Sequence, residues 1–203
     1  MFEPISVKVV LLGESGVGKT SIISQFVSKI FKPKSSTSLS AQFTSKVIDF
    51  PSYKKSIRFD IWDTVGQEKY RSLTRIFYKD AKIIIFVYDI TTEYSFNALK
   101  EYWYNETVNN TDGEPIYALC ANKYDLYDKQ VVKNEEGKQF AEKINAIFQN
   151  TSAASDMGIN ALFEKLGKKI INPKFDISKT DKESIKLDKN KNNANKEGKK
   201  GCC

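Results

Sequence analysis

The sequence predicts an α/β fold with a doubly wound, mostly parallel six-stranded sheet and one antiparallel edge strand. Continuous β-branched runs such as 83–88 are typical of strands that are buried on both faces of a parallel sheet. Segments typical of helices separate these runs along the chain. Two strand-like segments, 43–50 and 56–62, are joined by a five-residue turn, 51–55, and predict the antiparallel pair.

The elements follow one another in an alternating order. The expected strands are 5–12, 43–50, 56–62, 83–88, 116–120 and 146–150, and the expected helices are 21–27, 93–109, 134–145 and 160–171. Polar loops span 29–42 and 63–75, and Pro173 ends the last helix. We therefore expect one globular domain over residues 1–173 and a tail over residues 174–203.

Composition excludes several classes of protein. The chain has 203 residues, 40% of them hydrophobic, and no apolar run reaches the roughly 20 residues of a membrane span. Its first residues carry no basic and apolar leader, and Phe2 does not fit N-myristoylation, so neither signal is expected. Cys120 lies in an apolar run and is expected to be buried. The absence of His argues against a zinc site or a Ser-His triad.

Residues 13–21 read Gly-Glu-Ser-Gly-Val-Gly-Lys-Thr-Ser and fit the phosphate-binding pattern G-x-x-x-x-G-K-[ST]. An ordinary glycine-rich turn can match this pattern by chance, but here a strand precedes it and a helix follows, as the motif requires. Lys19 would supply a charge for the β- and γ-phosphates, and the Thr20 hydroxyl is a hard ligand suited to Mg²⁺. The candidate nucleotide-binding residues of this loop are Ser15, Gly16, Val17, Gly18, Lys19, Thr20 and Ser21.

A second motif, residues 63–68, follows the strand at 56–62. Asp63 is a candidate Mg²⁺ ligand that is expected to hold the ion through water. Gly66 offers a backbone N–H to a γ-phosphate, and Gln67 can orient a water for in-line attack.

Two further motifs indicate guanine. Asn122-Lys123-Tyr124-Asp125 follows the strand at 116–120, and the Asp125 carboxylate can accept two hydrogen bonds from guanine that adenine cannot donate. Thr151-Ser152-Ala153 follows the strand at 146–150, where a backbone N–H could meet the guanine carbonyl. The expected ligands are therefore GTP or GDP with Mg²⁺.

Taken together, these motifs resemble the Ras superfamily of small GTPases, which have a P-loop NTPase fold, and more narrowly the Rab family. The resemblance covers residues 5–172 and the last two residues, and its narrower part rests on 39–43, 61–64, 67–73, 77–81, 88–91 and Cys202-Cys203. It implies that Gln67 and Lys19 are catalytic and that Phe31 packs beside the base. It also implies that residues 31–43 and 64–78 switch with the nucleotide.

Three positions depart from the family pattern. Ser38 stands where the family has the Thr that ligates Mg²⁺, with Thr37 as the alternative if the register shifts by one residue. Val65 replaces the usual small residue before Gly66. Ser40 replaces a Gly, as in an early-endosomal branch of the family.

Residues 174–203 carry nine Lys against five acidic residues, a net charge of +4. Such a tail can be a solvated spacer, a weak nucleic-acid contact or a segment attracted to an anionic membrane. It has one aromatic residue, Phe175, and no Arg, so no nucleic-acid partner is expected. Disorder is expected from 188 to 201. The resemblance implies that Cys202 and Cys203 are both geranylgeranylated, because two lipid chains anchor stably where one does not.

The resemblance implies a monomeric GTP/GDP switch that recruits effectors to the cytoplasmic face of an endosomal or other vesicular membrane and cycles through the cytosol. Its implied partners are an exchange factor, a GTPase-activating protein, a dissociation inhibitor, an escort protein and effectors. With no arginine finger evident in the chain, intrinsic hydrolysis should be slow. The alternatives are a guanine-nucleotide-bound scaffold with little hydrolysis and, less favoured, a P-loop kinase acting on a small molecule.

Overall fold

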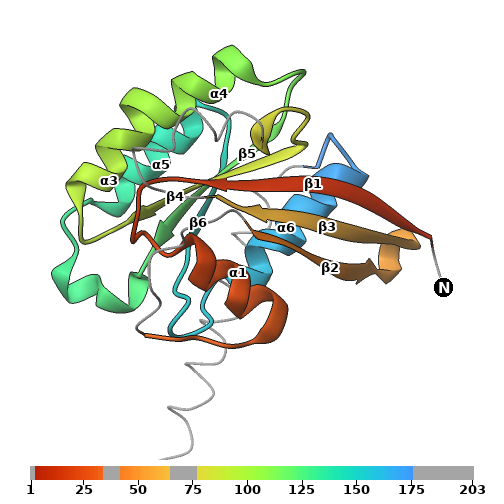
Figure 1. The fold of residues 1–203 in the computed structure, drawn as a ribbon, viewed down its shortest axis with the longest axis horizontal. Helices are drawn as coiled ribbons and strands as arrows, with labels where there is room; N and C mark the ends of the chain where they lie inside the picture. Colours follow the sequence, from red (N-terminus) through yellow and green to blue (C-terminus); the bar gives the residue numbers. More distant parts are fainter. Residues whose placement is uncertain (1–2, 34–41, 65–76, 176–203) are drawn as a thin grey trace, which may run out of the picture.

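The computed structural model describes residues 3–33, 42–64 and 77–175. Its six-stranded sheet has the order β2-β3-β1-β4-β5-β6 (Figure 1). The strands are β1 Pro4–Leu12, β2 Gln42–Phe50, β3 Lys55–Asp63, β4 Ile83–Asp89, β5 Ile116–Asn122 and β6 Ile147–Asn150. β2 pairs with β3 in the antiparallel sense and lies at an edge, whereas the other neighbours are parallel. The predicted fold class is confirmed.

Helices cover both faces of the sheet. They are α1 Lys19–Ser28, η1 Pro51–Tyr53, α3 Glu93–Ala98, η3 Leu99–Trp103, α4 Tyr104–Asn110, η4 Tyr124–Lys129, α5 Asn134–Lys143 and α6 Ile159–Ile171. The continuous helical segment α3-η3-α4 and α5 lie on one face, and α1 and α6 lie on the other (Figure 1).

Successive side chains of β1 point to opposite faces of the sheet, so this strand contributes to the hydrophobic cores on both faces. Val9 and Leu11 belong to the core under α1 and α6, whereas Val10 and Leu12 belong to the core under α3 and α5. Every residue of β4 is buried, as its continuous apolar run predicted. Cys120 of β5 is fully buried as well, and this burial raises the pKa of its thiol.

The strand register places the ends of several strands at one edge of the sheet. Leu11 pairs with Asp63 between β1 and β3, and Asp89 pairs with Asn122 between β4 and β5. The segment that follows β1 carries the phosphate-binding pattern. The residues singled out by sequence at these ends are therefore brought to the same side of the domain.

The expected helix 93–109 has a different internal geometry. Its middle, Leu99–Trp103, is a π-helical turn in which the Tyr104 N–H donates to the Leu99 carbonyl. A π-turn accommodates one extra residue in a helix, which the apolar pattern of the sequence does not reveal. The expected helix 134–145 also ends earlier, at Lys143, because Asn145 adopts a left-handed backbone conformation.

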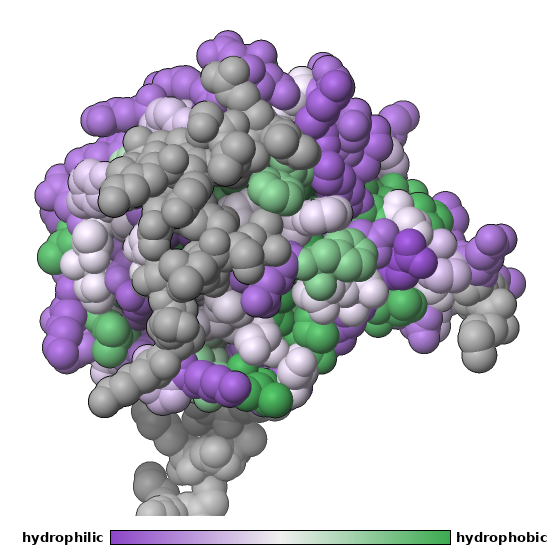
Figure 2. Space-filling model, viewed as in Figure 1, coloured by the Kyte–Doolittle hydropathy of each residue, from purple (hydrophilic) through white to green (hydrophobic). Residues whose placement is uncertain are grey.

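On the face seen in Figure 2, hydrophilic residues dominate the coloured periphery and hydrophobic residues form separate patches. Scattered apolar exposure of this kind is ordinary for a folded domain. Among the described residues, no helix has the length and apolar character needed to cross a bilayer.

Helices α1 and α6 pack against each other through stacked aromatic rings. The rings of Phe26 and Phe163 stack with centroids 3.6 Å apart, and Phe59 of β3 meets both rings edge-on. Replacing Phe163 by Ala should lower the free energy of unfolding by about 3–5 kcal/mol, because it leaves a cavity in a fully buried cluster.

Urea denaturation at one saturating nucleotide concentration measures this loss. Val108→Ala is the matched control, because Val108 is exposed on α4 and its truncation should change stability by under about 0.5 kcal/mol. Equal losses in the two variants would show that the stacked cluster does not hold the two helices together.

Candidate functional site

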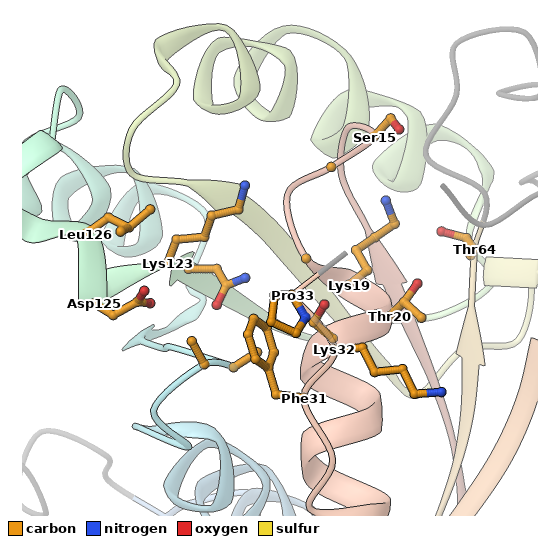
Figure 3. Close-up of a pocket in the computed structure, with 16 residues that line it drawn as sticks. Ser15, Lys19, Thr20, Phe31, Lys32, Pro33, Thr64, Lys123, Asp125 and Leu126 are labelled. Atoms are coloured by element: carbon orange, nitrogen blue, oxygen red, sulfur yellow. The ribbon is translucent and has the colours of Figure 1, made fainter. Parts of the chain in front are cut away.

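A cavity of about 330 Å³ opens where the carboxyl ends of β1, β3 and β5 meet (Figure 3). Its lining comes from the turn after β1 and the start of α1, the segment after α1, the residue after β3, and the segments after β5 and β6. The lining residues are Ser15, Gly16, Gly18, Lys19, Thr20, Ser21, Phe31, Lys32, Pro33, Thr64, Asn122, Lys123, Asp125, Leu126, Ala153 and Ala154.

Two glycines of the turn after β1 are required by close contacts. A Cβ on Gly13, whose φ is 146°, would lie 2.2 Å from the Val87 carbonyl oxygen. A Cβ on Gly18, whose φ is 98°, would lie 2.4 Å from Nδ2 of Asn122. The backbone therefore passes against β4 on one side and against the Asn122 amide on the other, and α1 begins at Lys19.

Lys19 places a buried cation at the cavity. Its Nζ donates to the carbonyl oxygens of Gly13 at 2.8 Å and Glu14 at 2.9 Å. Burial lowers the pKa of Lys19 to about 8, although Asp63 and Glu14 act in the opposite direction. An anionic ligand in the cavity would favour the charged form of this amine.

Asp63 and Thr20 bring two oxygen-bearing side chains together beside Lys19. The Thr20 hydroxyl donates to Oδ2 of Asp63 at 2.6 Å, and burial raises the pKa of Asp63. Oδ1 of Asp63 is buried and has no hydrogen-bond partner among the residues that the structure describes. Hard oxygens of this kind suit Mg²⁺, which takes few protein ligands and completes its shell with phosphate oxygens and water.

A preformed metal cage is not part of this arrangement. The described ranges contain no group of three or more Asp, Glu, Cys or His side chains that could hold an ion by themselves. The oxygens of Asp63 and Thr20 would fit Mg²⁺ together with phosphate oxygens and water.

The opposite end of the cavity is built around Asn122. Its Nδ2 donates to the Val17 carbonyl at 2.7 Å, and its Oδ1 accepts a hydrogen bond from the Thr151 hydroxyl at 3.1 Å. Asn122 is 1% exposed and ends β5. One amide thus connects the turn after β1 with the segment after β6.

Asp125 and Lys123 flank this amide. Oδ1 of Asp125 accepts from the Ser152 hydroxyl at 2.5 Å, which orients the carboxylate at the cavity wall. Lys123 forms an ion pair with Asp89 at 2.6 Å. Figure 3 shows Lys123, Asp125 and Leu126 across the cavity from Lys19, Thr20 and Thr64, with the Phe31 ring between the two groups.

Most candidate residues of the sequence analysis that lie in the described ranges line this cavity. Val17 and Ser152 do not; both are buried behind it and hold Asn122 and Asp125 through hydrogen bonds. Asp63 reaches the site through Thr20 rather than as a lining residue. The remaining candidates lie outside the described residues: Ser38, Gly66, Gln67, Cys202 and Cys203.

Sequence reasoning did not single out Lys32, Pro33, Thr64, Leu126 and Ala154, which also line the cavity. The Thr64 hydroxyl donates to the Leu11 carbonyl at 2.6 Å and so ties the end of β3 to β1. Lys32, Leu126 and Ala154 each adjoin a candidate residue, whereas Thr64 lies inside the motif 63–68 and Pro33 inside the expected switch segment 31–43. These positions were the signal available in the sequence.

A family model described as the Ras family matches residues 8–172 of the chain. Ras-related protein RabJ of Dictyostelium discoideum is 38% identical over 173 residues, which are 83% of this chain and 66% of RabJ. Ras-related protein Rab-22A of Homo sapiens is 38% identical over 163 residues, which cover 80% of this chain and 82% of the relative. This chain belongs to the Rab family of the Ras superfamily.

A further relative of this Rab-family chain is the putative Ras-related protein Rab-5B of Dictyostelium discoideum, 42% identical over 166 residues. That match covers 81% of this chain and 75% of the relative. Ras and Rab family members are GTPases, which hydrolyse GTP to GDP and phosphate. Membership in this family thus indicates that guanine nucleotides are the class of ligand for the cavity of this Rab-family GTPase.

The lowered pKa of Lys19 predicts that nucleotide binding depends on pH. With a pKa of about 8 in the free protein, Lys19 is mostly charged at pH 7 and mostly neutral at pH 9. Bound phosphates favour the charged form, so GDP binding should take up an increasing fraction of a proton between pH 7 and pH 9. GDP affinity should fall correspondingly as the pH rises.

Calorimetric titrations in buffers of different ionisation enthalpy measure this uptake. Lys19→Arg is the control, because its guanidinium stays charged throughout this range. The part of the uptake that belongs to Lys19 should disappear in that variant. Identical proton uptake in both proteins would exclude Lys19 as its source.

Proposed function

We propose that residues 1–173 form a GTPase domain that cycles between GTP-bound and GDP-bound states and recruits effectors to a membrane while GTP is bound. The observation that carries this proposal is the convergence of Lys19, Thr20, Asn122 and Asp125 on one cavity. A cation and hydroxyl at one end and a carboxylate at the other match a guanine nucleotide lying along it. Membership in the Rab family supports a role in membrane trafficking.

In this proposal the base lies at the Asp125 end. The carboxylate accepts hydrogen bonds from the two N–H groups on the guanine edge, and the Ala153 backbone N–H meets the guanine carbonyl. Phe31, which lines the cavity, packs beside the base. Adenine offers no matching donors, so it would leave the carboxylate unpaired.

The phosphates lie at the other end, in the turn formed by residues 13–18 and against the start of α1. Ser15 to Ser21 contribute backbone N–H groups, the Thr20 hydroxyl and the Lys19 amine. Thr20 and Ser38 would hold Mg²⁺ directly and Asp63 would hold it through water, while the Gly66 N–H would donate to the γ-phosphate. Mg²⁺, when bound, neutralises charge on the phosphate oxygens.

For hydrolysis we assign two catalytic residues. Gln67 orients the attacking water, and Lys19 stabilises the charge that develops on the phosphoryl oxygens. No arginine finger is evident in the sequence. The intrinsic rate of GTP hydrolysis should therefore be on the order of 10⁻³ per second or slower, and a GTPase-activating protein should raise it.

The C-terminal part of the proposal concerns the membrane. Residues 174–203 act as a lysine-rich spacer, and Cys202 and Cys203 each carry a geranylgeranyl chain that anchors the protein on the cytoplasmic face of an endosomal or other vesicular membrane. An escort protein, a dissociation inhibitor, an exchange factor and effectors are the partners that such a cycle requires.

A guanine-nucleotide-bound scaffold with little hydrolysis is the second candidate. It is favoured by Ser38 and Val65, which depart from the family pattern at the two switch segments. Gln67, Lys19 and Asp63 are all present, and this favours the hydrolysing switch.

Asp125→Asn tests the assignment of the base. An amide can accept only one of the two guanine hydrogen bonds, so GDP affinity should fall at least roughly 100-fold. Wild type should also prefer GDP to IDP, which lacks the 2-amino group, and this preference should largely disappear in the variant. Competition binding measures both quantities.

Asp128→Asn is the matched control, because Asp128 lies on the same η4 segment and does not line the cavity. It should bind GDP and IDP as wild type does. A preference for GDP over IDP that survives in Asp125→Asn would place the 2-amino group elsewhere.

Gln67→Leu tests the chemistry. Removal of the group that orients water should leave GTP bound, and single-turnover phosphate release should slow by at least roughly tenfold. Equal rates in wild type and variant would contradict the role of Gln67. Phosphate release by neither protein, even with an activating protein present, would favour the scaffold.

A further inference from the structure

A buried contact joins the π-helical turn η3 to the turn after β1. The indole Nε1–H of Trp103 donates to Oε1 of Glu14 at 3.0 Å, across 89 positions of the sequence. Trp103 is fully buried and Glu14 is 5% exposed. A hydrogen bond to a carboxylate is stronger when it is buried away from water than when it is exposed. Removal of the indole N–H would therefore leave the buried Glu14 carboxylate without that donor.

Glu14 also takes part in holding Lys19. The backbone carbonyl of Glu14 accepts a hydrogen bond from Lys19 Nζ, while its side chain accepts from Trp103. By orienting the Glu14 side chain, Trp103 therefore also affects the position of the Glu14 carbonyl, which accepts the hydrogen bond from the Lys19 amine. Trp103 itself does not line the cavity, so it would act only through Glu14.

The π-turn fits this arrangement. It spans Leu99–Trp103, and both terminal residues of this turn are fully buried. π-turns are rare and frequently occur at functional places, because the extra residue re-aims the side chains that follow. Here the residue at the end of the turn is the one that reaches Glu14.

We propose that Trp103 is a positioning residue for phosphate binding: its indole N–H holds the Glu14 segment in the conformation that receives the β-phosphate of the nucleotide. This inference rests on the proposed function, since it assumes that GDP occupies the cavity. A preorganised loop avoids the ordering cost that a loose loop must meet when the ligand binds. The loss of Trp103 N–H should therefore weaken phosphate binding specifically.

Competition binding of GDP and GMP to the full-length protein tests the proposal. Trp103→Phe keeps an aromatic ring and removes the N–H, and Glu14→Ala removes the acceptor. Each should lower GDP affinity roughly tenfold, in keeping with a lost hydrogen bond to a charged group. GMP has no β-phosphate, so its affinity should change less than about twofold in either variant.

Two comparisons separate positioning from loss of packing. Glu14→Gln keeps an oxygen acceptor for the indole and should bind GDP within about twofold of wild type. The double variant Trp103→Phe/Glu14→Ala should bind GDP no more weakly than Glu14→Ala alone, because both changes remove the same Trp103–Glu14 hydrogen bond. Trp62→Phe is the matched control, since it makes the same substitution at a tryptophan that packs against Phe43 and Phe77. It should bind GDP as wild type does.

Equal losses of GDP and GMP affinity would show a packing defect and overturn the proposal. So would additive losses in the double variant, or GDP affinity that stays at the wild-type value in Trp103→Phe. These results leave the proposed function intact as long as wild type binds GDP. A wild-type protein that binds no guanine nucleotide would instead contradict the proposed function, and this inference with it.

Discussion

One buried amide, that of Asn122, joins the loops on which the cavity depends. Its nitrogen donates to the Val17 carbonyl and its oxygen accepts from the Thr151 hydroxyl, so the segments after β1, β5 and β6 are connected through a single side chain. The amide also packs so closely against Gly18 that no larger residue fits there without displacing it. A shorter side chain would not span these partners, and a carboxylate could not donate to Val17. The geometry of the whole cavity therefore requires an amide at this position.

Two ionisable side chains at the other end of the cavity, those of Lys19 and Asp63, are buried away from water. Lys19 is buried against two carbonyl oxygens, and burial lowers its pKa because the lost solvation outweighs the nearby negative charges of Asp63 and Glu14. Asp63 is buried with one carboxylate oxygen lacking a hydrogen bond within the described residues, and its pKa is raised by burial. Both costs would be relieved together by a phosphate bearing a cation. Burial of these two side chains is therefore expected to lower the stability of the fold in exchange for ligand binding, as in other preorganised sites.

The sequence predicted the elements whose signal is local. The continuous apolar run of β4 and the alternation of β3 led to strands, and the glycine pattern after β1 led to the phosphate-binding turn. The π-turn at Leu99–Trp103 was not foreseen, because the buried residues Phe96, Leu99, Trp103 and Thr107 keep the three- and four-residue spacing of an ordinary α-helix. The Thr64 contact to Leu11 and the Trp103 contact to Glu14 span 53 and 89 positions. Contacts of this range depend on the packing of whole elements and have no signature in a short stretch of sequence.

The Asn122 amide holds both ends of the cavity, and the phosphate end has a second attachment in the core under α3 and α5. Asn122, Asp125 and Ser152 hold the base end through the segments that follow β5 and β6. At the other end, Glu14 is held by Trp103, which belongs to the core under α3 and α5. Tyr78, which packs in that same core, donates through its hydroxyl to Glu106 of α4. A displacement of the α3-η3-α4 segment would therefore act on the phosphate end of the cavity through Glu14, whereas the hydrogen bonds of Asn122 to Val17 and Thr151 do not depend on that segment.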